Sequence, residues 1–294
     1  MRKVSQNPGH LISTSHLEKM LWFLDDEDFK VAMNYVAIQA AKHQEVVVLA
    51  FVLMSNHVHF VLRGMRRDVV AFVNEFKRCY SIYYRKRHGA SEFLRANCLD
   101  VREADNVEEA LEKVIAYVID NPVAANICPH PCQYEWGTGS LYFSSRVKSE
   151  KAVRNLSRRE SVRLFHSASS SIPLDWGIDS GGVILPANYV DVSLVEKIFK
   201  TPARMNFFIR NSSKAKNKFE SGNNITSFKD QTILNCLQDI CWSLFQKPSF
   251  NELNDKEKAE FSRQIRFRFN SDVNQIARVC GITYSEAARL LDQP

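Results

Sequence analysis

Residues 46–62 of the chain read VVVLAFVLMSNHVHFVL, and the fold is decided in this stretch. An unbroken apolar run over 46–54 leads into Ser55 and Asn56, after which residues 57–62 alternate. A short apolar run that starts with β-branched residues is typical of a buried strand. Serine and asparagine are common turn residues. The stretch therefore predicts a β-hairpin.

The second strand of this hairpin carries two histidines. Side chains two positions apart on a strand point to the same face, so His57 and His59 project together, while Val58, Phe60 and Leu62 face the core. Two imidazoles side by side on a rigid strand are suited to bind a metal ion. The same pattern is also that of two surface or hydrogen-bonded histidines, which is the more common case for an isolated His-x-His.

Length and composition describe a globular chain. Its 294 residues, 45% of them hydrophobic, suit one large domain or two ordinary ones. The net charge of +6 leans toward a polyanionic partner. No apolar run approaches the ~18 residues of a membrane span, and no apolar segment follows the N-terminal positive charges, so we expect neither a membrane segment nor a signal peptide. Seven scattered cysteines fit reduced thiols and a cytoplasmic location.

Periodicity predicts the elements around the hairpin. Gly89 should end the helix predicted over 69–87. Pro122 disfavours helical geometry at the residue before it, so the helix predicted from 107 should end at Asn121. Asn106 and Glu109 resemble a capping box at its start. The expected elements are a short strand over 10–15, helices over 25–42, 69–87 and 107–121, a loop and strand over 90–104, and later helices over 193–199, 227–245 and 251–269.

This order of elements suits an α+β fold with a small antiparallel sheet. Helices could cover one face of the sheet and leave the two histidines on the other. Composition divides the chain into the α+β domain over 1–143, a polar and basic linker over 144–171, and a mainly helical accessory region over 172–294.

The helix predicted over 107–121 carries three polar residues on one flank. Lys113, Tyr117 and Asn121 lie four apart, beside the apolar stripe of the helix. On periodicity alone, Tyr117 is an ordinary packed tyrosine and Asn121 an ordinary C-terminal helix residue.

The end of the chain, 272–291, predicts two short helices joined by a tight turn at Gly281. The pattern resembles a helix-turn-helix whose second helix starts near residue 283. Such pairs also occur as plain packing units. In the DNA-binding interpretation, the side chains that face nucleic acid are Thr283, Tyr284, Ser285 and Arg289.

Four stretches together resemble the single-tyrosine HUH transposases of bacteria, and within them the REP-associated tyrosine transposases. They are LAFVLMSNHVHFVL, YYRKRHG, AYVIDNPVAANI and YEWGTGSLY, all within about residues 1–143. The joint pattern of Asn-His-Val-His and Tyr-x-x-x-Asn-Pro-Val is specific, although either half alone is weak. The resemblance implies a ferredoxin-like catalytic domain that cleaves and rejoins single-stranded DNA near hairpins, with a divalent metal, Mg²⁺ or Mn²⁺, and a transient 5′-phosphotyrosine.

Carried over by position, the resemblance makes Tyr117 the nucleophile and makes His57, His59 and Asn121 the metal ligands. It also implies a bacterial protein that is bound to the nucleoid when engaged on DNA, as a monomer or a homodimer. No nucleotide cofactor is expected, in keeping with the absence of a Walker-type loop. Residues 90–104 depart from the family pattern because they lack its Trp- and Arg-rich motif, which bears on how the substrate strand is held.

Basic and aromatic side chains around the hairpin are the expected DNA contacts. Cations would bind the phosphate backbone, and Tyr83 and Tyr84 would stack on bases if they are exposed. A solvated basic helix face is the alternative for any one of them. The expected cations are Arg63, Arg66, Arg67, Lys77, Arg78, Arg85, Lys86, Arg87 and Lys113.

Two other functions stay open at this point. A domesticated derivative without catalysis would keep the scaffold and bind DNA or RNA, and the altered 90–104 segment favours it. A metal-dependent hydrolase in which Tyr117 is structural would cleave without any covalent intermediate.

Overall fold

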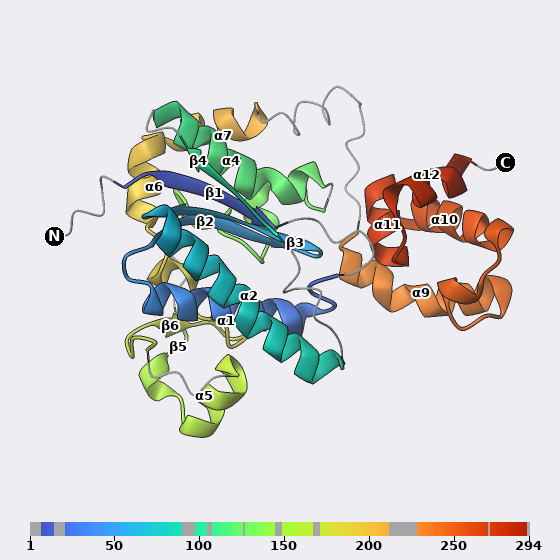
Figure 1. Cartoon of the computed structure of the whole chain (residues 1–294), viewed down its shortest axis with the longest axis horizontal. Coiled ribbons are helices and arrows are strands. Elements are labelled where there is room, and N and C mark those ends of the chain that lie inside the picture. The colour runs from blue at the N-terminus through green and yellow to red at the C-terminus, as the bar shows by residue number, and fades with distance from the viewer. Residues whose placement is uncertain are drawn as a thin grey trace.

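The computed structural model describes residues 7–14, 21–89, 98–104, 108–125, 127–144, 149–166, 171–211, 228–269 and 271–292. They form a four-stranded antiparallel sheet with helices on both faces, followed by a separate group of helices (Figure 1). The predicted α+β fold is confirmed. None of the described helices combines the length and the apolar character needed to cross a membrane.

The N-terminal elements have the order of a ferredoxin-like fold. Their bounds are β1 Gly9–Thr14, α1 Asp26–Lys42, β2 Val47–Met54, β3 His57–Arg63, α2 Arg66–His88, β4 Leu99–Ala104 and α4 Glu108–Ala124. The sheet order is β2-β3-β1-β4, and every neighbouring pair is antiparallel. The connectivity from β1 to β4 is therefore β-α-β-β-α-β, as the resemblance implied.

The hairpin forms where alternation predicted it. Val58, Phe60 and Leu62 are fully buried on the face that packs against α2. The Phe60 ring lies 6.0 Å from that of Phe72 and 5.6 Å from that of Phe76, measured between centroids. Burying a phenylalanine side chain contributes roughly 1.5–3 kcal/mol, so this alternation fixes which face of β3 turns inward.

Local signals also set the helix ends. The Asp25 carboxylate caps α1 by accepting from the backbone N–H of Asp28 at 3.0 Å. Gly89 ends α2 in the left-handed region, at φ 78°, as its position predicted. The capping box predicted at Asn106 and residues 90–97 of the predicted loop lie outside the described residues.

Helices cover both faces of the sheet, whereas we expected the histidine face to stay open. Helices α1 and α2 lie on one face, and α4 crosses the other against β2 and β3 (Figure 1). The apolar stripe of α4, including Leu111, Ile115 and Val118, is buried in this contact. The apolar side chains on this face of the sheet must be buried against another element, and α4 buries them. The same packing brings Tyr117 over the histidines.

Helix α4 does not end at Asn121, as Pro122 had predicted, but continues to Ala124. Proline has no N–H to donate to the carbonyl four residues earlier, here that of Val118. The Asn121 side-chain amide compensates, because its Nδ2 donates to the Tyr117 carbonyl at 2.7 Å and to that of Val118 at 3.4 Å. The expected helix end was wrong because a side chain replaced the missing backbone donor.

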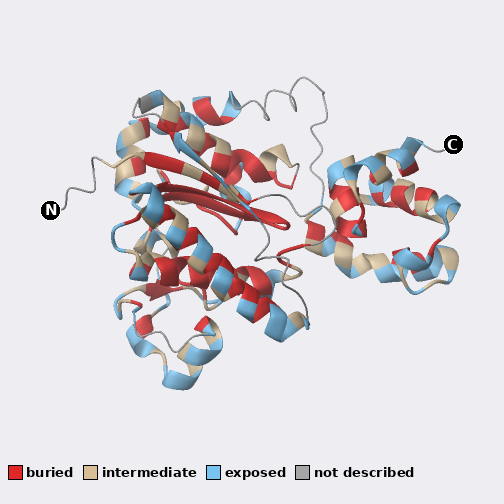
Figure 2. Cartoon of the chain, in the orientation of Figure 1, coloured by how far each residue is buried: buried red, intermediate tan, exposed pale blue. Residues whose placement is uncertain are grey.

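The remaining elements complete two hydrophobic cores. They are η2 Pro131–Gln133, β5 Lys151–Ala152, η3 Val153–Asn155, α5 Arg158–Phe165, β6 Gly177–Ile178, η4 Pro186–Asn188, α6 Val192–Phe199, α7 Pro202–Arg210, α9 Asp230–Phe245, η5 Phe250–Glu252, α10 Asp255–Phe269, α11 Val273–Cys280 and α12 Tyr284–Asp292. The first core extends from the sheet to Ile209, and the second lies between Ile233 and Leu290. Figure 2 shows the two groups of buried residues.

This packing differs from the division expected at residues 143 and 171. Helix α5 lies within the predicted linker, yet its Phe165 is buried in the first core. The Asn34 side chain of α1 donates to the Leu164 and Gly182 carbonyls at 3.2 and 3.0 Å and accepts from Ile184 N–H at 2.9 Å. Residues up to about 211 therefore belong to the first core, because they cover α1 and α4.

The final helix pair forms as predicted. Helices α11 and α12 are joined at Gly281, which adopts φ 66°. Ile276, Ala277, Ala287 and Leu290 are buried between these helices and α10. The pair is thus a packed unit of the second core, and its role in DNA binding stays a prediction.

Candidate active site

The two histidines of β3 form a close, buried pair. Their ring centroids lie 4.7 Å apart with the rings nearly perpendicular, at 88°. His57 is 5% exposed and His59 is 3% exposed. The interpretation of His57 and His59 as surface histidines is therefore wrong, because α4 and the C-terminal helices cover this face.

A neighbouring side chain orients the first imidazole. The Oδ1 of Asn56 lies 2.8 Å from Nδ1 of His57, so Nδ1 is the nitrogen that donates a hydrogen bond. The lone pair of the neutral ring then lies on Nε2, which is the usual arrangement of a histidine prepared to ligate a metal. Because Asn56 belongs to the turn of the hairpin, the conformation of the turn sets the orientation of the His57 ring.

Helix α4 brings the other two predicted site residues to the pair. The Tyr117 ring stands edge-on to the His59 ring at a centroid distance of 5.7 Å. One turn later, Asn121 lines a cavity of about 350 Å³ together with His57. The four residues that the resemblance assigned to the site, scattered over strand and helix, thus converge in the folded chain.

The donor set at this point fits a divalent metal that keeps open coordination positions. The amide oxygen, with water or phosphate oxygens, suits Mg²⁺ or Mn²⁺, whereas the two imidazoles alone would permit Zn²⁺ as well. Because Nδ2 of Asn121 donates to the helix backbone, a metal would take the amide oxygen. In the part of the chain that the structure describes, no three His, Cys, Asp or Glu side chains converge on one point. The site would therefore depend on the amide and on oxygens from substrate or water.

The C-terminal helices hold the turn that precedes His57. Ser55 Oγ donates to the Asp230 carboxylate of α9 at 2.5 Å. The same carboxylate accepts from Gln275 Nε2 at 2.8 Å and from Arg278 Nε at 2.8 Å, both on α11. Asp230 is buried, and it ties the second core to the hairpin.

The same helices form one wall of the histidine cavity. Asp272, Asn274 and Arg278 line it opposite His57 and Asn121. None of these three was identified from the sequence, and neither was Asp230. Ser55 and Asp230 are 175 residues apart along the chain, and no local pattern links positions at such a separation.

Acid is expected to weaken this contact. Burial alone would raise the pKa of Asp230, but the Arg278 guanidinium and the hydrogen bonds from Ser55 and Gln275 outweigh it and lower the pKa below the ordinary 3.8. A lowered folded-state pKa stabilises the fold above the unfolded-state value, and this stabilisation is lost as the pH falls through the folded-state value. In urea denaturation, the stability difference between wild type and Asp230→Asn should be constant near neutral pH and shrink below pH 3.8. An unchanged difference down to acid unfolding would contradict this.

Three predicted DNA contacts on α2 are buried. Lys77 is 6% exposed, and burial lowers the pKa of its ammonium group. The Tyr83 hydroxyl donates to Asp28 at 3.1 Å, and the Tyr84 ring packs against His88. Base stacking by Tyr83 and Tyr84 was predicted only if they are exposed, and this condition is not met, because α1 and α2 pack side by side and enclose the aromatic face of α2.

Most of the other predicted cations are at the surface and lie away from the histidines. Arg87 binds Asp25 at 2.7 Å and Arg78 binds Glu75 at 2.6 Å. Arg63 is half-buried, and burial lowers its pKa. Helix α2 covers the sheet face opposite the histidines, and its exposed basic residues are Arg66, Arg67, Arg78, Arg85, Lys86 and Arg87.

Of the predicted cations, Lys113 lies in the same groove as Tyr117. On α12, Tyr284 and Ser285 are exposed, and Arg289 binds Asp255 at 3.3 Å. The Thr283 hydroxyl caps α12. None of these four residues lines the histidine cavity, whose helical lining comes from α4 and α11.

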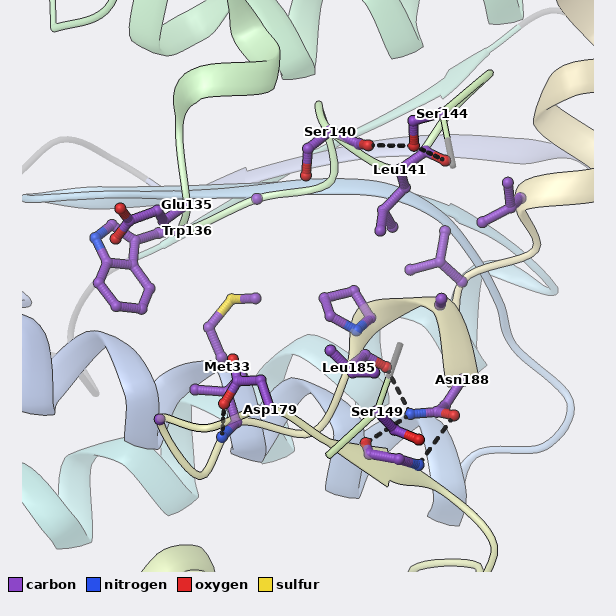
Figure 3. Close-up of a pocket in the computed structure, with 18 of the residues that line it drawn as sticks. Met33, Glu135, Trp136, Ser140, Leu141, Ser144, Ser149, Asp179, Leu185 and Asn188 are labelled. Carbon is purple, nitrogen blue, oxygen red and sulfur yellow. Dashed lines mark hydrogen bonds between the residues drawn. The ribbon is translucent and has the colours of Figure 1, made fainter. Parts of the chain in front are cut away.

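A larger cavity, of about 640 Å³, is lined mainly by α1 and by the segments 135–144 and 175–193 (Figure 3). Two of its polar side chains serve the loops that form it: Asn188 bonds to the backbone of Gly177 and Leu185, and Asp179 accepts from Val183 N–H. Because these groups are engaged in the walls and no pair of imidazoles faces the space, we place the candidate active site at the histidines instead.

The folded chain places the paired histidines beside a helix-borne tyrosine, as the sequence resemblance implied. Residues 7–98 match the family described as IS200-like transposase. This part of the chain is therefore similar to the single-tyrosine transposases, a family that acts in DNA transposition. The match contains both histidines and ends before Tyr117 and Asn121. No curated protein and no solved structure matches the chain.

Proposed function

We propose that this protein nicks and rejoins single-stranded DNA at hairpin or palindromic sites, through a 5′-phosphotyrosine formed on Tyr117 and with a divalent metal. One observation carries the proposal: Tyr117 stands against His59 while Asn121 and His57 line one cavity. The match of residues 7–98 to the transposase family supports a role in DNA transposition. The geometry of the four residues supports the phosphotyrosine reaction.

The proposed reaction exchanges one phosphoester for another. Tyr117 Oη attacks the scissile phosphorus and forms a new P–O bond, while the bond to the 3′ oxygen of the preceding nucleotide breaks. The phenol loses a proton and the departing 3′ oxygen gains one, so the step is balanced. Attack of a 3′ hydroxyl on the phosphotyrosine reverses the exchange. The covalent link conserves the phosphoester bond, and rejoining therefore needs no nucleotide cofactor.

Each residue of the site has a distinct part in this proposal. A metal held by His57, His59 and the Asn121 oxygen would neutralise charge on the non-bridging phosphate oxygens. Asn56 orients the His57 ring. The Asn121 amide holds the end of α4 together across Pro122, which keeps Tyr117 and Asn121 one turn apart on a rigid element.

The test is formation of a covalent adduct with labelled single-stranded hairpin DNA from the flanks of the gene, in Mg²⁺ or Mn²⁺. We expect wild type to form an adduct that survives denaturing electrophoresis. Chelation of the metal or His57→Ala should reduce the adduct by more than ~100-fold. His130→Ala, a change of an exposed histidine on the loop before η2, is the control and should leave it unchanged. An adduct formed equally by His57→Ala would overturn the metal role.

A second function is favoured by one observation: among the described residues, no three His, Cys, Asp or Glu side chains form a group that could hold a metal ion. A non-catalytic DNA- or RNA-binding protein on the same scaffold would bind the hairpin and form neither adduct nor product. A hydrolase would give cleavage without an adduct. The electrophoretic assay separates the three outcomes.

A further inference from the structure

A groove of about 620 Å³ runs beside Tyr117, and a helix outside the family match completes it. One side consists of β1 and β4, and the other of α4 and α7. The residues that matter here are Asp100, Arg102, Lys113, Tyr117 and Phe207. Helix α7 lies beside α4 in Figure 1, so the chain beyond residue 200 shapes the surroundings of the proposed nucleophile.

Phe207 presents its ring to this groove. Its side chain is 60% exposed, whereas the adjacent Phe208 is buried against Phe199 at a centroid distance of 6.1 Å. The Phe207 ring is held edge-on to that of Phe208, 5.6 Å away. Phe208 therefore packs α7 on the core, whereas the Phe207 ring lies outside the core and is open to a ligand.

Helix α7, which carries the Phe207 ring, is held in place by polar contacts. Arg204 on α7 makes a bidentate contact with Glu112 on α4, with distances of 2.6 and 3.0 Å. Glu112 is fully buried, whereas the Arg204 side chain is 39% exposed, so the pair ties α7 to the core at its edge. Thr201 caps the helix by accepting from Arg204 N–H at 3.2 Å. An aromatic residue on a fixed helix loses little freedom when a ligand stacks on it, which favours binding.

The charges of the groove suit a phosphate backbone. The Arg102 side chain is 73% exposed and pairs with Asp100 at 2.7 Å, and that of Lys113 is 64% exposed and lies 3.7 Å from Glu109. Such exposed pairs are weak, so a phosphate can take over either cation. Asp100 is the one carboxylate among the residues lining the groove, against the two cations Arg102 and Lys113.

We propose that Phe207 stacks on an unpaired base of the DNA strand that lies beside Tyr117, with Arg102 and Lys113 on its phosphates. The partner is thus a single strand, since a base within a duplex cannot present its face to the ring. This inference rests on the proposed function for the reason to place a DNA strand there. It assigns α7 the task of holding the strand in register with the nucleophile.

The experiment measures binding apart from cleavage. Fluorescence anisotropy with a labelled oligodeoxythymidine gives the dissociation constant in a Tyr117→Phe background, where no adduct can form. Phe207→Ala should weaken binding roughly tenfold, and Phe207→Trp should retain it. Phe267→Ala, which removes a ring that is 87% exposed on α10, is the matched control and should bind as the parent does. A labelled blunt duplex should be insensitive to Phe207.

Equal binding of single strands by Phe207→Ala and Phe267→Ala would overturn the inference, and so would an equal loss of duplex binding in Phe207→Ala. Adduct formation by the wild type is scored separately. If binding does not depend on Phe207 while the wild type still forms the adduct, only the stacking role is excluded. Phe207-dependent binding without any adduct keeps the stacking role and removes the proposed catalysis.

Discussion

Replacing Tyr117 with phenylalanine is expected to lower formation of the protein–DNA adduct by at least ~10³-fold, because the variant has no oxygen with which to attack phosphorus. The ring that contacts His59 at 5.7 Å remains in place, and the side chain is only partly buried. We therefore expect the fold, its thermal stability and the affinity for single-stranded DNA to change little. Electrophoresis of the adduct and anisotropy of the same labelled hairpin measure the two effects.

The matched control for this substitution is Tyr189→Phe. The Tyr189 ring packs against Phe51 and Trp176 and does not line the histidine cavity, so its hydroxyl should be dispensable for the adduct. If Tyr117→Phe still cleaves DNA at the wild-type rate, the phosphotyrosine mechanism is excluded and the hydrolase interpretation takes its place. If cleavage is absent from wild type as well, while the hairpin is still bound, the non-catalytic binding protein is the better description.

The second large effect concerns stability. Asp230→Ala is expected to destabilise the C-terminal helices by about 3–5 kcal/mol, the usual cost of removing one partner from a buried ion pair. The Arg278 side chain is 13% exposed and would be left with its charge in the protein interior, and Ser55 would lose its acceptor. Urea denaturation followed by circular dichroism measures the change in the free energy of unfolding.

Asp255→Ala is the control for this substitution. Its partner Arg289 lies 3.3 Å away, but both side chains are at least half exposed, so the change should cost less than about 1 kcal/mol. The double variant Asp230→Ala with Arg278→Met should regain part of the loss, because the uncompensated charge is then removed. Equal effects of Asp230→Ala and Asp255→Ala would contradict the role given to the buried pair.

Much of the catalytic scaffold could be predicted from local sequence. The hairpin, α1 and α2 each follow from a run of apolar residues with the period of a strand or a helix, and Gly89 marks an end through its backbone freedom. Pro122 marks the limit of this approach. Its effect on α4 depended on whether a nearby side chain could replace a lost donor, and Asn121 does so.

The site, too, has a part that local sequence predicts and a part that it does not. The resemblance located His57, His59, Tyr117 and Asn121 because their spacing along strand and helix is part of a motif. Burial of Lys77 was not predicted, since a basic residue near the edge of a helix stripe turns inward or outward according to the elements that pack against it.

The α+β class, the alternation that turns two histidines to one side of a strand, and the tyrosine and asparagine one helical turn apart all follow from local sequence. These features depend on interactions between residues close in the chain. The folded chain adds that α4 covers the histidine face, that α7 borders Tyr117, and that Asp230 binds Ser55. Each of these joins segments far apart in sequence, and their contacts depend on the packing of two complete cores rather than on any local pattern.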